Sequence, residues 1–385
     1  MPQAFVRDRL TWVMYLVLGW FAYLQAAPGL VVPHLRDELD LSYSVGGLHV
    51  AAFAAGSMLG GLVSAHLERA LGRAVLLWGS AALMGAGTVG LTAGQSAVMT
   101  IGSVFVMGTG GGLLLVTLQA VLSDQHGDHR SVALTEANLS ASVAYLVLIG
   151  ALSLAAALHW GWRTALLLSL LAPLVLWWTN RSLPMAAPPV TEVAKEPLPR
   201  PFWIAVGILV CTTAAEWCVT GWGASFAEEA SDVSAERAVS MMAGFFVGVL
   251  AGRTLGSRLA LRIEPTRLLG YALALSGLGF AVLWSSTSTP QTVTGLLALG
   301  LGIGNLFPMG MSIAVSLAPG RAVLATGRAV TVTSLAVLVA PLTVGGIADA
   351  TSLKTALLVV PLMLGLAGVG LVAVVRATAP VGARV

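Results

Sequence analysis

Charged side chains are scarce in this sequence of 385 residues, because only 10% of them are Asp, Glu, Lys or Arg. A soluble domain carries about 25% charged residues, so the composition excludes an ordinary soluble fold. The net charge is only +3, and the basic residues occur in short clusters between apolar runs. This distribution gives no support to nucleic-acid binding.

Cysteine is also rare, with Cys211 and Cys218 as the only two. A structural zinc site normally needs four ligands, and a disulfide framework needs more cysteines than these. Their spacing of seven residues puts both thiols on one face of a helix. We interpret them as buried packing residues, and we expect neither a metal nor a cofactor.

Long apolar runs dominate what the sequence does contain, and 57% of the residues are hydrophobic. Lipid offers no hydrogen-bond partners, so such continuous runs favour membrane-spanning helices, which need about 20 residues each. The run from Trp12 to Val32 is longer than the core of a typical signal sequence, and we interpret it as a retained first helix. Cutting at polar and proline-rich clusters predicts twelve spans, near 11–33, 43–65, 74–93, 97–122, 132–157, 163–180, 202–226, 238–260, 266–286, 291–317, 322–347 and 354–376. The predicted fold class is an all-α integral membrane protein.

One segment near the middle of the chain has the composition of a linker. It contains Glu192, Lys195 and Glu196 together with the prolines Pro184, Pro188, Pro189, Pro197 and Pro199. We therefore predict an N-terminal six-helix bundle over 1–180, a linker over 181–201 and a C-terminal six-helix bundle over 202–385.

The Lys and Arg residues fall mostly on one side of the predicted spans. If the N-terminus is cytoplasmic, fifteen of them are inside, whereas only Arg36, Arg163, Arg237 and Lys354 are outside. Cytoplasmic loops of membrane proteins carry this excess. We predict that both termini and the linker are cytoplasmic, in a plasma membrane or a bacterial inner membrane.

The second half of the chain repeats the first. A shift of 191 or 192 residues places Trp12 on Trp203, Arg130 on Arg321, and WRTALLL from Trp162 on LKTALLV from Leu353. Six spans per half make the two halves parallel in topology, with a cavity between them. Rocking of one half against the other would expose that cavity alternately to each side of the membrane.

The repeat also pairs two glycine series, Gly108, Gly110 and Gly112 with Gly300, Gly302 and Gly304. Glycine-rich loops can bind nucleotides, but neither series follows a strand. Small residues let membrane helices approach one another closely, and we interpret both series in that way.

The turn after the second span carries a further motif, HLERALGRAV from His66. Together with the twelve spans in two sixes and the central linker, this turn resembles the major facilitator superfamily. Gly72 and Arg73 match the family's loop signature, whereas Glu68 replaces the usual Asp and one extra residue precedes the glycine. The resemblance implies a cavity lined by the first, fourth, seventh and tenth spans. It also implies contact of the second span with the eleventh and of the fifth with the eighth.

Glu216 lies near the middle of the seventh span, where a carboxylate is costly. Removal from water favours the protonated acid, so Glu216 could gain and lose a proton as the cavity opens and closes. We predict a proton-coupling or substrate-binding role; the alternative is a carboxyl group neutralised by a structural hydrogen bond. Its counterpart in the first half is Gln25, which cannot titrate.

Aromatic and amide side chains on facing helices suit a neutral or amphipathic organic solute. The further candidates for the solute site are Thr213, Trp217, Trp222, Asn305 and Phe307. Each of them, taken singly, could instead serve packing or anchoring at the membrane interface.

Two charge pairs could close the cytoplasmic side if the spans meet as the resemblance implies. Arg253, the one basic residue well inside a span, would face Glu136, and Arg328 would face Glu68 beside Arg73. Pairing of these side chains with backbone carbonyls, lipid phosphates or water is the alternative.

The leading prediction is a monomeric, proton-coupled secondary transporter of a small organic solute, with lipid and protons as its other partners. A multidrug or metabolite efflux carrier is the alternative within the same class. A channel on the same scaffold is less favoured, and an intramembrane enzyme is disfavoured because the spans lack paired aspartates and an HExxH motif. We expect that the protein is not an enzyme.

Overall fold

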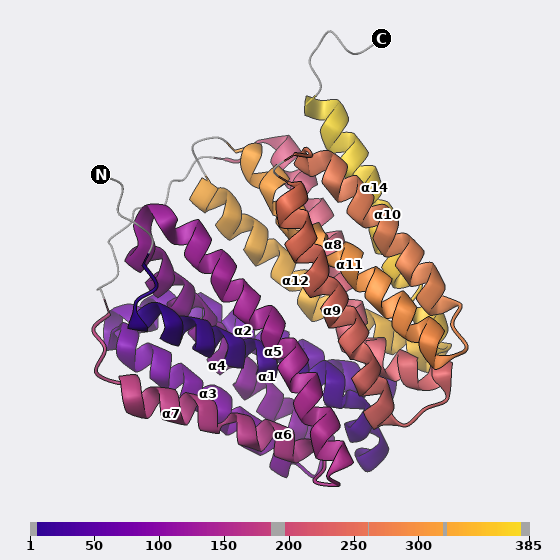
Figure 1. The fold of residues 1–385 in the computed structure, drawn as a ribbon, viewed down its shortest axis with the longest axis horizontal. Helices are drawn as coiled ribbons and strands as arrows, with labels where there is room; N and C mark the ends of the chain where they lie inside the picture. Colours follow the sequence, from indigo (N-terminus) through magenta and orange to yellow (C-terminus); the bar gives the residue numbers. More distant parts are fainter. Residues whose placement is uncertain (1–5, 186–196, 261, 319–321, 379–385) are drawn as a thin grey trace. The chain divides into compact units, whose positions relative to one another are not determined.

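The computed structural model describes residues 6–185, 197–260, 262–318 and 322–378 (Figure 1). The chain divides into two compact units, residues 1–190 and 191–385. Within the described ranges no strand occurs, and twelve helical spans are long and apolar enough to cross a membrane. The predicted all-α membrane fold with twelve spans is confirmed. Lys195, Arg321, Arg384 and most of the predicted linker 181–201 lie outside the described residues.

The first unit holds spans one to six. Span six is divided into two helices, and a short 3-10 turn precedes α5. The elements are α1 (Arg9–Leu39), α2 (Tyr43–Leu71), α3 (Arg73–Ala93), α4 (Ala97–His126), η1 (Gly127–His129), α5 (Arg130–Ala157), α6 (Trp162–Ser169) and α7 (Leu171–Asn180).

The second unit holds spans seven to twelve, and its last span is again divided. The elements are α8 (Arg200–Ser231), α9 (Ala235–Leu259), α10 (Pro265–Trp284), α11 (Thr289–Ser316), α12 (Ala322–Ala350), α13 (Leu353–Ala356) and α14 (Val359–Thr378). The divisions in spans six and twelve lie just before Pro173 and Pro361, whose rings fit the first turn of α7 and α14.

Several helices extend beyond the predicted spans. The first span was predicted to end at residue 33, whereas α1 continues to Leu39 and contains Pro28 and Pro33. Prolines are tolerated in membrane helices because neighbouring groups satisfy the freed carbonyls. The extra turns carry Arg36 and Glu38.

Helix ends recur in both halves at a shift of 192 residues. Asp40 ends α1 and Asp232 ends α8, both in the left-handed conformation with φ of 51° and 49°. Aspartate tolerates this conformation better than most residues. The N-cap serines of α2 and α4, Ser42 and Ser96, recur as Ser234 and Ser288 before α9 and α11. The repeat therefore extends to the chemistry of the helix ends.

The two glycine series bring helices into backbone contact within each unit. A Cβ atom on Gly108 or Gly112 would collide with the carbonyl of Phe53 or Ser57 on α2, and Gly110 faces α3 in the same way. In the second unit Gly300 and Gly304 face α9, and Gly302 faces α10. The close-packing interpretation of the glycines is confirmed, and the same three-helix arrangement occurs in each half.

Candidate functional site

The central feature of the second unit is a charge pair between α8 and α9. Glu216 is at the centre of α8, and its Oε1 atom lies 3.8 Å from Nη2 of Arg253. The side chains are 23% and 33% exposed, respectively. A charge-assisted hydrogen bond is about 2.7–2.9 Å long. The two charges attract one another without the short contact of a hydrogen-bonded pair.

Thr213 precedes Glu216 by three residues, so both lie on one face of α8. The Oγ1 atom of Thr213 is buried, and within the described residues it has no hydrogen-bond partner. A buried hydroxyl without a partner costs free energy, and a bound water or ligand group removes that cost. Trp217, the residue after Glu216, is half-buried.

Asn305 on α11 approaches the same stretch of α9. Its side chain is 8% exposed, and a Cβ atom on Gly256 would overlap its amide oxygen. Gly256 and Arg253 are three residues apart on α9, so Asn305 packs next to the face that carries the arginine. Phe307, two residues further along α11, is half-buried.

Trp222 lies deeper in the packing of the second unit. Its side chain is fully buried, and its indole Nε1 donates a hydrogen bond of 2.9 Å to the carbonyl of Pro341 on α12. This bond ties α8 to α12. In this structure Trp222 performs a packing role.

In the first unit the counterpart of Glu216 is neutral and already has a partner. Tyr145 on α5 donates its hydroxyl to Oε1 of Gln25 on α1, at 3.1 Å. Gln25 is half-buried, so its amide nitrogen can serve as a donor to a solute. Tyr145 was not predicted as a site residue, although a tyrosine within the fifth span is visible in the sequence.

Glu136 on α5 has its partners in the first unit. Arg7, just before α1, donates from Nε and Nη2 to the two carboxylate oxygens at 2.8 and 2.6 Å, and Tyr15 donates at 3.1 Å. The hydrogen bond and the charge of Glu136 raise the pKa of Arg7. This two-pronged contact ties the start of α1 to α5.

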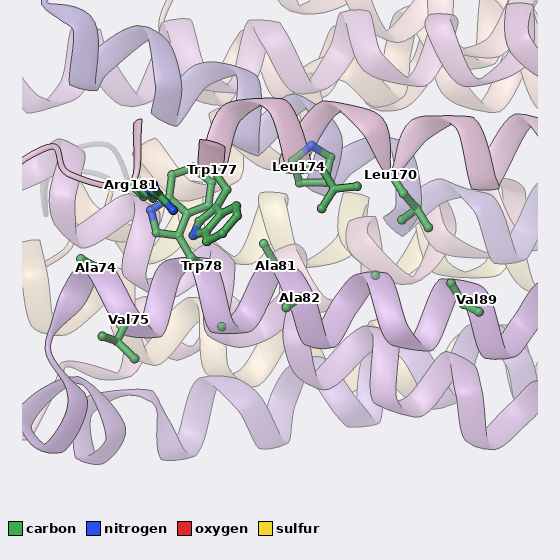
Figure 2. A pocket seen from close by; sticks show the side chains of 13 residues that line it. Ala74, Val75, Trp78, Ala81, Ala82, Val89, Leu170, Leu174, Trp177 and Arg181 are labelled. Atoms are coloured by element: carbon green, nitrogen blue, oxygen red, sulfur yellow. The ribbon is translucent and has the colours of Figure 1, made fainter. Parts of the chain in front are cut away.

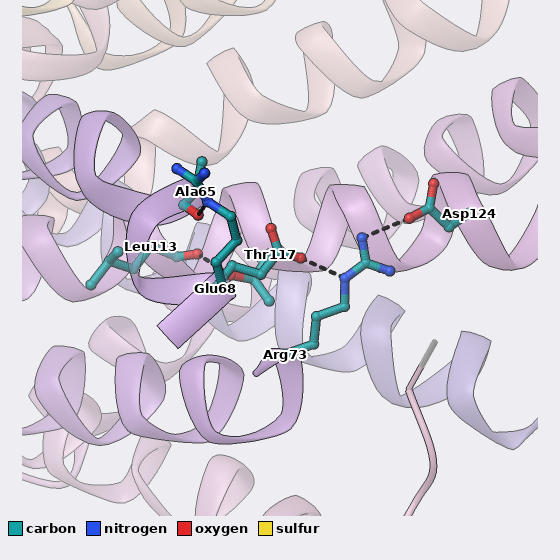
Figure 3. Close-up of polar contacts among 7 residues, drawn as sticks. Ala65, Glu68, Arg73, Leu113, Thr117 and Asp124 are labelled. Atoms are coloured by element: carbon teal, nitrogen blue, oxygen red, sulfur yellow. Dashed lines mark hydrogen bonds and ion pairs between the residues drawn. The ribbon is translucent and has the colours of Figure 1, made fainter. Parts of the chain in front are cut away.

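The loop motif forms a second tight charge cluster (Figure 3). Arg73, at the start of α3, donates from Nε to Glu68 at 2.5 Å and from Nη2 to Asp124 on α4 at 2.6 Å. The arginine side chain is 4% exposed, so its charge is neutralised by these two carboxylates. Asp124 was missed from the sequence, although it is an isolated acid at the end of the fourth span.

Comparison with known proteins decides the family. A sequence profile of the Major Facilitator Superfamily matches residues 11–241, more than half of the chain. The chain belongs to the major facilitator superfamily. No curated protein matches it significantly.

Solved structures of several transporters share the fold of this superfamily member. A bacterial homologue of the human lysosomal transporter Spinster, in an inward-facing and occupied conformation, has a TM-score of 0.81 at 14% identity, over 97% of this chain and 98% of its own. A D-xylose–proton symporter has a TM-score of 0.77 at 15% identity, over 96% of both chains. The nucleoside transporter NupG has a TM-score of 0.76 at 11% identity, over 96% of this chain and 100% of its own.

The expected gating pairs of this superfamily member join residues of different units. Glu136 and Glu68 belong to the first unit, whereas Arg253 and Arg328 belong to the second. In the structure Glu136 pairs with Arg7, Arg253 with Glu216, and Glu68 with Arg73. Arg328 is exposed on α12. The two pairs between the halves stay predictions.

Metal ligands do not gather in the part of the chain that the structure describes. No three His, Cys, Asp or Glu side chains lie close enough together to hold an ion. Cys218 is buried and Cys211 half-buried, and both are free thiols. The polar side chains described above on α8, α9 and α11 are Glu216, Thr213, Arg253 and Asn305.

Proposed function

We propose that this protein is a monomeric secondary transporter that moves a small organic solute by alternating access, with Glu216 as the proton-coupling acid. The observation that carries the proposal is the loose pair between Glu216 and Arg253 at 3.8 Å. Placing a carboxylate at the centre of a membrane helix costs free energy, so its presence there favours a functional role. The side chain of Glu216 is also 23% exposed, so a proton or a solute can reach it.

The other ion pairs differ in geometry from the pair of Glu216 and Arg253, and this difference supports a functional role for Glu216 and Arg253. Arg73 contacts Glu68 at 2.5 Å and Arg7 contacts Glu136 at 2.6 Å, and each arginine holds its place through two short hydrogen bonds. Those pairs lie at helix ends. The pair at the centre of α8 is longer, so a proton or a solute group can displace the arginine more easily.

Protonation of Glu216 would remove the charge that holds Arg253 in place. Arg253 would then be able to move towards another carboxylate, because a cation within a span is stabilised by an opposite charge. We assign that role to Glu136, the partner expected from the family resemblance, with Arg328 and Glu68 as the second closing pair. Proton uptake would in this way change which side of the cavity is closed.

The solute would be neutral or amphipathic. The described parts of α1, α4, α8 and α11 carry no Lys or Arg in their central turns, and the charge of Arg253 on α9 is matched by Glu216. A phosphorylated or dicarboxylate solute would need more than one free cation. Gln25, Thr213, Trp217, Asn305 and Phe307 offer amide, hydroxyl and aromatic groups instead. Trp222 would contribute by holding α8 against α12 rather than by touching the solute.

Orientation and location follow from the distribution of Lys and Arg. The protein would lie in a plasma membrane or a bacterial inner membrane, with both termini in the cytoplasm. Accessibility of single cysteines placed near Arg9 and near Trp160 to a membrane-impermeant thiol reagent tests this orientation, in a variant in which Cys211 and Cys218 are serine. Labelling at the Arg9 position in intact cells would contradict it.

The test of the proposal needs a solute, and ligand binding to the folded protein supplies one. A thermal-shift screen of the purified full-length protein against sugars, nucleosides, amino acids and amphipathic cations identifies compounds that raise its melting temperature. In proteoliposomes with an imposed pH gradient, the wild-type protein should accumulate such a compound against its concentration gradient.

The variant Glu216→Gln keeps the shape of the side chain and removes its charge. We expect it to lose accumulation driven by the pH gradient while it retains solute exchange between the two sides. Glu229→Gln, the same change at an exposed position near the end of α8, serves as the control. Accumulation by Glu216→Gln at the wild-type rate would show that another residue carries the proton.

A further inference from the structure

A groove lies on the first unit between α3 and the divided sixth span. Its volume is about 760 Å³. The lining residues are almost all apolar or small, namely Ala74, Val75, Trp78, Gly79, Ala81, Ala82, Gly85, Val89, Leu170, Pro173, Leu174, Trp177 and Arg181. Figure 2 shows that Arg181, Trp177 and Trp78 gather at one end of the groove, whereas Leu170 and Val89 lie at the other.

The groove exists because the facing side of α3 carries small residues. A Cβ atom on Gly79 would meet nothing within 4 Å, whereas one on Gly85 would lie 3.6 Å from Leu170 of the sixth span. Val75 and Leu174 are 60% and 58% exposed, so the groove is open at the surface of the bundle. Surfaces of this kind on a membrane-spanning bundle meet lipid chains.

The polar end of the groove offers both a cation and a hydrogen-bond donor. The guanidinium carbon of Arg181 lies 5.3 Å from the ring centre of Trp177 and 5.0 Å from that of Trp178. Within the described residues no carboxylate pairs with Arg181. The indole Nε1 of Trp78 is buried and, over the same described ranges, has no acceptor. An acceptor placed at this end would satisfy the buried N–H group and neutralise the arginine.

The internal repeat shows that the fold does not require these groups. Trp78, Trp177 and Arg181 correspond in the second half to Gly270, Gly368 and Val372. There α10 packs directly against α14, with Leu371 3.8 Å from the position of a Cβ atom on Gly270. The two tryptophans and the arginine of the groove are therefore not repeated at the matching positions of the second half.

We propose that this groove binds one anionic phospholipid of the cytoplasmic leaflet. One acyl chain lies along α3 from Trp78 towards Val89, the phosphate contacts Arg181, and an ester or phosphate oxygen accepts from Nε1 of Trp78. From Ala74 to Val89 the helix rises about 22 Å, which exceeds half of a hydrocarbon core of about 30 Å. Anionic lipids are concentrated in the cytoplasmic leaflet, where the Lys and Arg distribution places Arg181. This orientation selects the leaflet, but the site itself does not depend on transport.

The experiment measures lipid binding to the purified full-length protein in detergent. Phosphatidylglycerol and phosphatidylcholine with identical acyl chains are titrated separately, and inorganic phosphate provides a third arm. Bound lipid is counted by native mass spectrometry, and the melting temperature is followed in parallel. We expect one phosphatidylglycerol to bind at least tenfold more tightly than phosphatidylcholine, with no effect of free phosphate.

Three variants test the groups of the site, and two test specificity. Arg181→Gln and Trp78→Phe should each lower the affinity for phosphatidylglycerol, the first by about tenfold. Gly79→Leu should abolish binding, because its side chain fills the groove at a position with open space. Arg376→Gln, at the end of α14, and Gly277→Leu, an open position on α10, are the matched controls and should bind as the wild type does.

The possible outcomes distinguish binding at this site from non-specific binding of lipid to the protein surface. Equal binding of the two lipids, or an equal loss in Arg181→Gln and Arg376→Gln, would overturn the proposal. Stabilisation by free phosphate alone would mean that the polar end binds an anion without a lipid chain, which also contradicts it. The result for Gly79→Leu is valid only if this variant keeps the wild-type melting temperature without lipid. If it does not, Trp78→Phe, which keeps an aromatic ring but removes the N–H donor, is the deciding variant.

Discussion

Arg253 on α9 faces Glu216 on α8 within one bundle, with 3.8 Å between the guanidinium nitrogen and the carboxylate oxygen. The pair joins a basic residue inside α9 to the acid at the centre of the neighbouring helix. Each charge thereby lowers the cost of placing the other in the membrane. Any movement that separates them must supply a new partner or a proton.

Charge reversal distinguishes this pair from the proposed pair between the halves. Glu216→Arg and Arg253→Glu should each abolish transport, because each leaves two like charges together. If the pair within the bundle is what matters for folding, the double variant should recover the wild-type melting temperature and protein yield. The measurement is thermal unfolding of the detergent-purified variants.

The gate requires a different double variant, Glu136→Arg with Arg253→Glu. Recovery of solute exchange in proteoliposomes, relative to the two single variants, would support a contact between the halves during the cycle. No recovery would argue against it. Arg7→Gln serves as a control because Arg7 is the partner of Glu136 in this structure.

Arg73 should be essential for the stability of the first unit. Its side chain is 4% exposed and contacts both Glu68 and Asp124 (Figure 3). Arg73→Gln leaves two carboxylates without their cation, and we expect a loss of about 2–3 kcal/mol, because breaking a fully buried pair costs about 3–5 kcal/mol and Asp124 is 31% exposed. Arg73→Lys should recover only part of this, because lysine lacks the planar fork that reaches both acids.

The neighbouring Arg69 provides the control for this prediction. It is exposed and donates to the carbonyl of Ala65, so Arg69→Gln should change stability by no more than about 0.5 kcal/mol. Equal melting temperatures of Arg73→Gln and Arg69→Gln in detergent would contradict a structural role for the cluster.

The sequence was sufficient to predict the helices but not their neighbours. Apolar runs determine where the chain crosses the membrane, and the N-cap serines Ser42 and Ser96 could have placed two helix starts. The division of span six was missed although Pro173 indicates it. Both are local features, and local chemistry is what a single sequence records.

The partners of the charged residues could not be predicted in the same way. Glu216 was identified because its depth in a span depends on sequence alone. Its contact with Arg253 depends on how α8 and α9 are rotated about their axes, and the pairing of Glu136 with Arg7 depends on a side chain outside any span. Nothing in the spacing of these residues determines those rotations.

Asp8 should make the stability of the first unit depend on pH. It caps α1 by accepting from the backbone and the hydroxyl of Thr11, at 2.8 and 2.6 Å, and it accepts from Gln125 on α4 at 2.8 Å. Partial burial opposes its ionisation, but these hydrogen bonds outweigh burial, so the pKa of Asp8 lies below its usual value. The ionised form is favoured in the folded protein.

The direction of this pKa shift determines how the stability of the fold changes with pH. A lowered pKa contributes stability that is complete above the unfolded value, about 3.9, and is lost as the pH falls through the folded value. Asp8→Asn keeps a cap without the charge, so the wild type should be more stable than Asp8→Asn at pH 6, and this advantage should shrink below about pH 4. Asp8→Ala should lose about 1 kcal/mol at pH 6 because the cap is gone. A difference between wild type and Asp8→Asn that grows on acidification would contradict the assignment.

Substitution of the paired glycines should destabilise the two halves by similar amounts. A Cβ atom on Gly108 would collide with the carbonyl oxygen of Phe53, and one on Gly300 would collide with that of Phe245. The obstacle is backbone in both places, so it cannot rotate away, and Gly108→Ala and Gly300→Ala should each cost about 1–3 kcal/mol. Gly346→Ala on α12 meets open space and should be neutral or stabilising by up to about 1 kcal/mol, since alanine favours the helix. Melting temperatures of the three variants test the prediction, because a loss of stability at Gly346 as large as that at Gly300 would mean that close approach of the backbones does not explain the cost of the substitution.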